Sequence, residues 1–240
     1  MKKLSIIIVL LLAFTMGSGP FSCDDTPTGY GLEFDGVDDY VQVNHHSSLD
    51  RTDLPVTLAG WVKPDPSAAY KYIFGKAYKW SQAYGFRHDD NLQILISIRN
   101  SSGDAVYNTG YNLTAGEWQH IALTHDGTST LRLYLDGENG WTKTDAISIG
   151  DNGNHFYIGR VNRDIADGGL YEGQARDVCV YDSALSTADV ETIMNGGVVS
   201  GLISRWKLDE GSGSTAYDNS GNDNHGTLYG NPVWLQLAIE

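Results

Sequence analysis

The sequence predicts an all-β protein: a two-sheet antiparallel jelly-roll sandwich with one short helix near residues 186–194. Many short segments alternate apolar and polar residues, as half-buried strands do, and Gly, Asn and Asp gather between them. The chain has 240 residues, 28 of them glycine, and is 41% hydrophobic, which suits one large domain with many turns. The formal net charge of -14 weighs against nucleic acid and anionic lipid as partners.

The N-terminal segment has the pattern of a secretory signal peptide. Lys2 and Lys3 precede an apolar run, residues 4–16, that is too short to span a bilayer as a helix. We therefore predict a signal peptide over residues 1–22 and a linker over residues 23–29, and exclude both from the fold.

The residues around Cys23 resemble a bacterial lipoprotein processing site, with a small residue before the cysteine and acids after it. Pro20 stands where such sites usually have leucine, and ordinary cleavage near residues 17–19 is the alternative. We expect a bacterial protein that is secreted or held at the cell surface or outer membrane. An acyl chain on Cys23 would be its only membrane contact.

The first predicted element is a hairpin over residues 31–43, in which Leu32, Phe34, Val41 and Val43 alternate with outward residues. Further strands are predicted at residues 56–64, 72–76, 84–87, 92–98, 118–125, 131–135, 156–160 and 178–181. A helix follows, for which Ser186 is the expected N-cap and Asp189 completes a capping box. Gly196 and Gly197 end it.

Six motifs in consistent order carry a resemblance to a known family. The stretch LEFDGVDDYVQV, residues 32–43, looks like the entry motif of laminin G-like jelly rolls, the concanavalin A-like β-sandwiches of secreted bacterial proteins. The segments that match later family motifs are residues 56–64, 118–127, 131–137, 156–160 and 171–185. The resemblance implies a laminin-G-like sandwich spanning residues 30–234.

The last segment, residues 201–234, resembles the stretch that usually precedes the entry motif. One explanation is a truncated second repeat. The other, which we favour, is that the segment closes the sandwich, because an open sheet edge invites aggregation.

Aspartates near strand ends predict a structural calcium site, since calcium takes carboxylate and carbonyl oxygens. The turn around Gly36 supplies Asp35 and Asp38. Asp177 looks like the metal-ligand aspartate of related jelly-roll sugar hydrolases, and Asp209 and Asp218 are further candidates. The alternative is that Asp-Gly and Asn-Gly pairs merely form turns.

No catalytic residues are predicted. Residues 33–38 resemble the E-x-D-x-x-E signature of retaining glycosidases, but the last acid is Asp38 and the run continues as the family's DDYV. We expect a non-catalytic binding or adhesion module for carbohydrate or an extracellular protein. The alternatives are a glycan-active hydrolase and a purely structural surface or matrix component.

Aromatic side chains in or near predicted loops are the candidates for ligand contact, because their rings can stack on the C–H faces of sugars. The predicted ligand-binding residues are Tyr78, Trp80, Tyr111 and Trp141, and Tyr70 and Tyr107 also lie in or near predicted loops. The alternative for each is edge packing or core burial.

Overall fold

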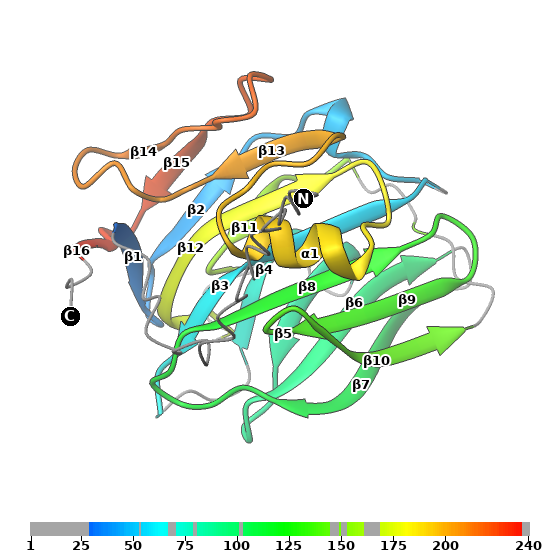
Figure 1. The fold of residues 1–240 in the computed structure, drawn as a ribbon. Helices are drawn as coiled ribbons and strands as arrows, with labels where there is room; N and C mark the ends of the chain where they lie inside the picture. The colour runs from blue at the N-terminus through cyan, green and yellow to red at the C-terminus, as the bar shows by residue number, and fades with distance from the viewer. Residues whose placement is uncertain are drawn as a thin grey trace, which may run out of the picture.

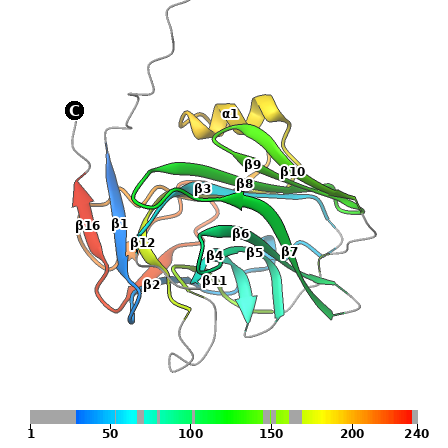
Figure 2. The same ribbon diagram turned by 90° about the horizontal axis from the view of Figure 1, so that it is seen from below.

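The computed structural model describes residues 29–52, 54–66, 71–78, 81–100, 103–144, 149, 153–160 and 169–236. These residues form two antiparallel sheets packed face to face, with one short α-helix, which confirms the predicted fold class. Figure 2 shows the two layers and places the helix on the outside of one of them. The predicted signal peptide, Cys23 and most of the predicted linker lie outside the described residues.

Sheet A contains eight strands. In spatial order they are β10 (Glu138–Thr144), β9 (Thr130–Leu135), β8 (Gln119–His125), β3 (Val56–Pro64), β12 (Glu172–Tyr181), β1 (Tyr30–Asp35) and β16 (Val233–Gln236), with β13 (Leu202–Trp206) also paired to β12. Sheet B also contains eight strands, in the order β14 (Thr215–Ala216), β15 (Gly226–Tyr229), β2 (Tyr40–Val43), β11 (Phe156–Ile158), β4 (Lys71–Tyr78), β5 (Ser81–His88), β6 (Gln93–Asn100) and β7 (Gly103–Asn112).

The core lies between the sheets and follows the alternation read from the sequence. Leu32 and Phe34 of β1, and Val41 and Val43 of β2, are buried in it. Trp206 of β13 is fully buried and stacks on Phe156 of sheet B, with ring centroids 4.9 Å apart. Such contacts across the layers hold the two sheets together by removing large apolar surfaces from water.

A second apolar cluster covers the outer face of sheet A, beneath helix α1 (Thr187–Met194). The predicted capping box is present: the Ser186 hydroxyl accepts from the Asp189 N–H, and the Asp189 carboxylate accepts from the Ser186 N–H. Val190 and Ile193 pack on the buried Cys179 and its neighbours. The helix therefore explains why the middle of sheet A is buried on both faces.

Residues 202–236 add strands to both sheets (Figure 1). In sheet A, β13 pairs with residues 178–181 of β12, along the edge that β1 uses at residues 172–175. β16 pairs with the free edge of β1, while β15 extends sheet B beyond β2. The segment is thus integrated into the sandwich. No helix in the described part of the chain is long and apolar enough to cross a membrane.

Candidate functional site

The turn between β1 and β2 gathers three carboxylates, which we call the acidic turn. Carboxylate oxygens of Asp35, Asp38 and Asp39 all lie within 4.8 Å of one another. The Asp35 Oδ1 atom accepts hydrogen bonds from the N–H groups of Val37 at 2.8 Å and Asp38 at 3.3 Å. The Asp39 Oδ2 atom accepts from the Asp35 N–H at 3.1 Å. The turn is therefore ordered by its own aspartates.

The aspartates of this turn differ in proton affinity. Burial, together with the negative charges of Asp35 and Asp38, raises the pKa of Asp39. For Asp35 burial also raises the pKa, but the N–H groups of Val37, Asp38 and Asp39 outweigh it and lower the pKa overall. Three carboxylates so close fit a divalent cation such as calcium, which would take about six to eight oxygens in all.

Asp177 lies apart from the acidic turn and pairs with Arg205. It occupies the bulge in β12 at φ 49°, and its carboxylate accepts from Arg205 Nε at 2.6 Å and Nη2 at 2.8 Å. The same guanidinium donates to the carbonyls of Gly196 and Gly197 after helix α1. This two-pronged ion pair ties the bulge, β13 and the end of the helix together.

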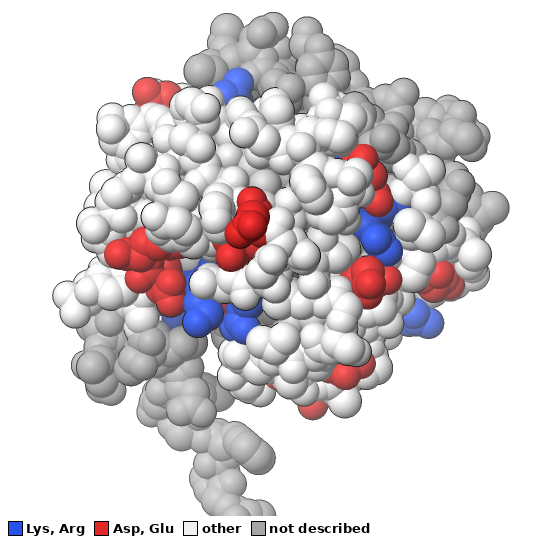
Figure 3. All heavy atoms as spheres, turned by 90° about the horizontal axis from the view of Figure 1, so that it is seen from above, with Lys and Arg blue, Asp and Glu red and all other residues white. Residues whose placement is uncertain are grey.

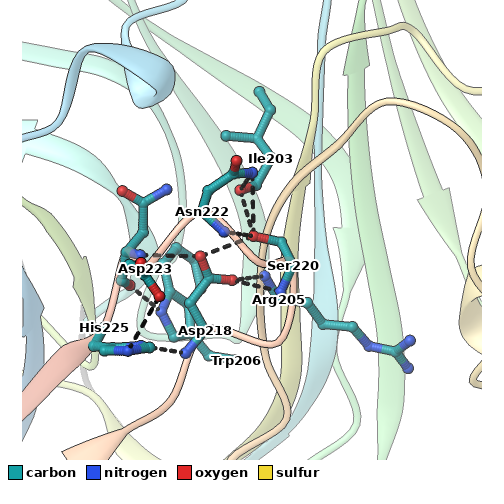
Figure 4. A network of polar contacts seen from close by, with 9 residues as sticks. Ile203, Arg205, Trp206, Asp218, Ser220, Asn222, Asp223 and His225 are labelled. Atoms are coloured by element: carbon teal, nitrogen blue, oxygen red, sulfur yellow. Dashed lines mark hydrogen bonds and ion pairs between the residues drawn. The ribbon is translucent and has the colours of Figure 1, made fainter.

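Asp218 organises the loop between β14 and β15 (Figure 4). Its Oδ1 atom accepts from the N–H groups of Arg205 at 2.9 Å and Ser220 at 3.0 Å. Its Oδ2 atom accepts from the Ser220 hydroxyl at 2.8 Å and the Asn224 N–H at 3.0 Å. The carboxylate is buried, and these four donors match its lone-pair positions.

Of the five predicted calcium ligands, the structure therefore brings together only Asp35 and Asp38, with Asp39 as the third carboxylate of the group. Asp209 is exposed and lies outside that group. Asp39 is not among the predicted ligands, although it is one of the three aspartates of this turn and its neighbour Tyr40 begins β2.

Two predicted ligand-binding residues, Tyr111 and Trp141, lie at one side of the sandwich, where the edge strands β7 and β10 approach each other (Figure 2). The rings of Tyr107 and Trp141 lie 6.1 Å apart, and both pack against the core. Tyr111 is 39% exposed. We call these three residues the aromatic edge. The expectation of loop positions is wrong for Tyr107 and Trp141, which lie within β7 and β10, whereas Tyr111 is the last residue but one of β7 and borders a loop.

Gly140 makes this arrangement possible. The pairing of β10 with β9 shifts register between Asn139 and Trp141, so Gly140 forms a bulge. A Cβ atom at Gly140 would lie 3.0 Å from Cε1 of Tyr111, so the Tyr111 ring rests on bare backbone. The bulge puts Trp141 opposite the core residue Leu133. The Tyr78 side chain and Trp80 lie outside the described residues.

The charge of the surface is dispersed. On the face shown in Figure 3, Asp and Glu side chains form separate groups, and Lys and Arg side chains lie beside some of them. The net charge of -14 therefore does not make one continuous acidic field on this face.

The two sheets form a jelly-roll β-sandwich. A comparison of sequences identifies the family to which the chain belongs. The Laminin_G_3 model, described as the concanavalin A-like lectin/glucanases superfamily, matches residues 35–191. The chain belongs to this family. A comparison with curated proteins found no match.

Solved structures of the same fold include sugar-binding proteins. A candidate carbohydrate-binding protein from Bacteroides ovatus ATCC 8483 matches with a TM-score of 0.71 and 20% identity, over 89% of this chain and 62% of that one. The chain thus spans less than two thirds of that structure.

Two more distant structures also match. Domain 4 of AbnA, a GH43 extracellular arabinanase from Geobacillus stearothermophilus solved in complex with arabinotriose, has a TM-score of 0.52 and 17% identity. The match covers 67% of this chain and 74% of that one. The heptameric SAP-like pentraxin of Limulus polyphemus has a TM-score of 0.51 and 19% identity, over 69% and 82% of the two chains. At these identities the likeness shows the fold.

Proposed function

We propose that this protein is a non-catalytic carbohydrate-binding module and that the aromatic edge contacts the sugar. The observation that carries the proposal is that the Tyr107 and Trp141 rings lie 6.1 Å apart and that the exposed Tyr111 ring rests on the neighbouring Gly140. Aromatic rings offer flat apolar faces to the C–H groups of a sugar, and Tyr and Trp each add a polar atom. The carbohydrate-binding proteins among the structures of this fold support the same class of ligand.

The three rings are held in place before any ligand binds, which favours a role in ligand recognition. Tyr107 and Trp141 are held by the core, so a ligand that packs on them immobilises few further side chains. Tyr111 is fixed on one side by the bulge at Gly140. The surface is therefore largely preformed, as small-ligand sites usually are.

We further propose that calcium binds the acidic turn as a structural ion and that the module works outside the cell. Asp35 and Asp38 supply the ligands expected from the sequence, and Asp39 adds a third carboxylate. The signal-peptide pattern and Cys23 support secretion, with a lipid anchor as the only membrane contact.

The test is a glycan array probed with the mature chain, followed by titration calorimetry with the best ligand, with and without calcium. We expect Tyr111→Ala and Trp141→Ala each to weaken binding by about 0.5–1.5 kcal/mol, which is roughly 2- to 12-fold in Kd. Tyr217→Ala is the matched control, because Tyr217 is 52% exposed on another strand end. Melting temperatures show whether each variant is folded.

Three outcomes would contradict the proposed site or the proposed function. Unchanged sugar affinity in folded Tyr111→Ala and Trp141→Ala would remove the aromatic edge from the site. Cleavage of a bound glycan by the native chain would indicate the hydrolase alternative. Failure to bind any glycan would favour an extracellular protein ligand or a structural role.

A further inference from the structure

A second aromatic group lies on the outer face of sheet B, away from the aromatic edge. Tyr40 of β2 and Tyr229 of β15 are directly opposite each other in the ladder, and their rings stack with centroids 4.8 Å apart at 10°. Val41 and Val43 point into the core, so Tyr40 points outward. The guanidinium carbon of Arg160 lies 4.4 Å from the Tyr40 ring centroid.

The three side chains form one column, which we call the tyrosine stack. β15 and β11 pair with opposite edges of β2, and Arg160 closely follows β11. Tyr229 and Arg160 therefore approach the Tyr40 ring from opposite sides. Cation–π and offset-stacking attractions hold Tyr40 between them, and Tyr40 in turn positions Tyr229.

The column ends on the far face of Tyr229. β14 pairs with Gly226 and Thr227 of β15, and the Ser214 carbonyl before β14 accepts from the Leu228 N–H, but no strand of sheet B among the described residues pairs with Tyr229 on that side. The residue is 41% exposed. The tyrosine stack thus presents an accessible ring whose other face is already packed.

We infer that the far face of Tyr229 is a second carbohydrate-contacting surface, which takes the apolar C–H face of a neutral pyranose ring. A sugar stacked there adds one layer to an ordered column and so costs little side-chain entropy.

The charges beside the stack favour a neutral sugar over an anionic one. Gly230 sits against the acidic turn, where a Cβ atom would lie 2.4 Å from the Asp39 carboxylate and 2.5 Å from the Asp38 carbonyl. The cation of the column, Arg160, is engaged on the opposite side of Tyr40. Three carboxylates exceed the charge of one calcium ion, so the turn stays negative even with the ion bound, and a sugar carboxylate or sulfate at Tyr229 would meet negative charge nearby.

The two aromatic surfaces lie at opposite ends of sheet B. Five strands, β2, β11, β4, β5 and β6, separate β15, which carries Tyr229, from β7. Six spacings of about 4.8 Å put the surfaces roughly 29 Å apart. A polysaccharide can reach both, whereas a trisaccharide is too short. This inference rests on the proposed function, and it predicts that polymers bind more tightly than their fragments through effective concentration.

The experiment measures retardation of the full mature chain in native gels that contain xylan, glucomannan, galactomannan or mixed-linkage β-glucan. Binding of the corresponding trisaccharides is followed by saturation-transfer NMR. The variants are Tyr229→Ala, Tyr229→Phe, Trp141→Ala and, as the matched control, Tyr217→Ala. Each variant is first checked by its melting temperature.

We expect Tyr229→Ala and Trp141→Ala each to weaken binding of the preferred polysaccharide at least 10-fold, while Tyr229→Phe and Tyr217→Ala stay within 2-fold of the native chain. In Tyr229→Ala, trisaccharide signals should persist at the aromatic edge. Native affinity in Tyr229→Ala together with loss in Trp141→Ala would overturn this inference and leave the proposed function standing. Loss in Tyr229→Ala with no change in Trp141→Ala would overturn the aromatic edge alone. No retardation of the native chain by any of the four polymers would overturn both.

Discussion

Replacing Asp218 by asparagine should destabilise the protein through the loop that this residue organises. Its carboxylate accepts four hydrogen bonds, three of them from backbone N–H groups. An amide keeps one acceptor oxygen and turns an NH2 group toward the donors that the other oxygen served. In either orientation it therefore leaves a backbone N–H facing a donor.

The magnitude follows from the groups left without an acceptor. One orphaned N–H costs about 1–3 kcal/mol, and the remaining bonds lose the strengthening that a charged acceptor gives. We expect Asp218→Asn to lower the free energy of unfolding by about 2–4 kcal/mol, which is a large share of the roughly 5–15 kcal/mol of a typical domain.

The assay is urea unfolding followed by tryptophan fluorescence, with Asp223→Asn as the control. Asp223 lies in the same loop, but its side chain is 90% exposed and 3.7 Å from His225. That variant should stay within about 0.5 kcal/mol of the native chain. The same small effect for Asp218→Asn would refute the reasoning. A loss that vanishes in chelator would show that Asp218 acts through a metal ion instead of protein donors.

Three further predictions concern pH, calcium and the last segment. Burial lowers the pKa of His120 to about 3. The pKa of His120 in the unfolded chain is about 6.5. Between pH values of about 6.5 and about 3, His120 binds a proton in the unfolded chain but not in the folded one, so stability should fall as the pH falls. His120→Gln should flatten this slope between pH 7 and pH 5 in urea unfolding. Chelator should lower the melting temperature of the native chain, and Asp38→Asn should lower it similarly and abolish the effect of chelator; an unchanged melting temperature in chelator would argue against the ion. Deleting residues 202–236 should yield an aggregating domain in size-exclusion chromatography, because β1 and β2 lose partners on their outer edges. A monodisperse, equally stable truncation would contradict that role.

Local patterns in the sequence predict the parts of this fold that depend on neighbouring residues. Alternation places Leu32, Phe34, Val41 and Val43 in the core, and the Ser186 capping box begins the helix. The same alternation cannot show that the middle of sheet A is buried on both faces, because the covering helix lies far away along the chain.

The candidate sites depend on contacts between residues that are distant in the chain, and the sequence does not predict those contacts. An aspartate near a glycine can serve a cation, a backbone N–H or an arginine equally well, and Asp177 meets Arg205 only after β12 and β13 pair. The sequence did not predict that Trp141 lies in a strand, because β10 is largely exposed and polar and has a bulge that breaks its alternation. Tyr107 meets Trp141, and Tyr111 meets Gly140, because β7 and β10 are the edge strands of different sheets and lie next to each other.

The pairing of β1 with β16 has a consequence for how the chain reaches its folded state. Tyr30 is matched with Gln236, so the first strand completes its hydrogen bonds only when the last described strand is available. About half of the other ladders also join segments that are far apart in sequence, and such topologies fold slowly, on a scale of milliseconds to seconds. A growing chain would hold β1 with one edge exposed until β16 had been synthesised. Protection of this unpaired edge from other chains in the meantime is therefore a requirement of the architecture itself.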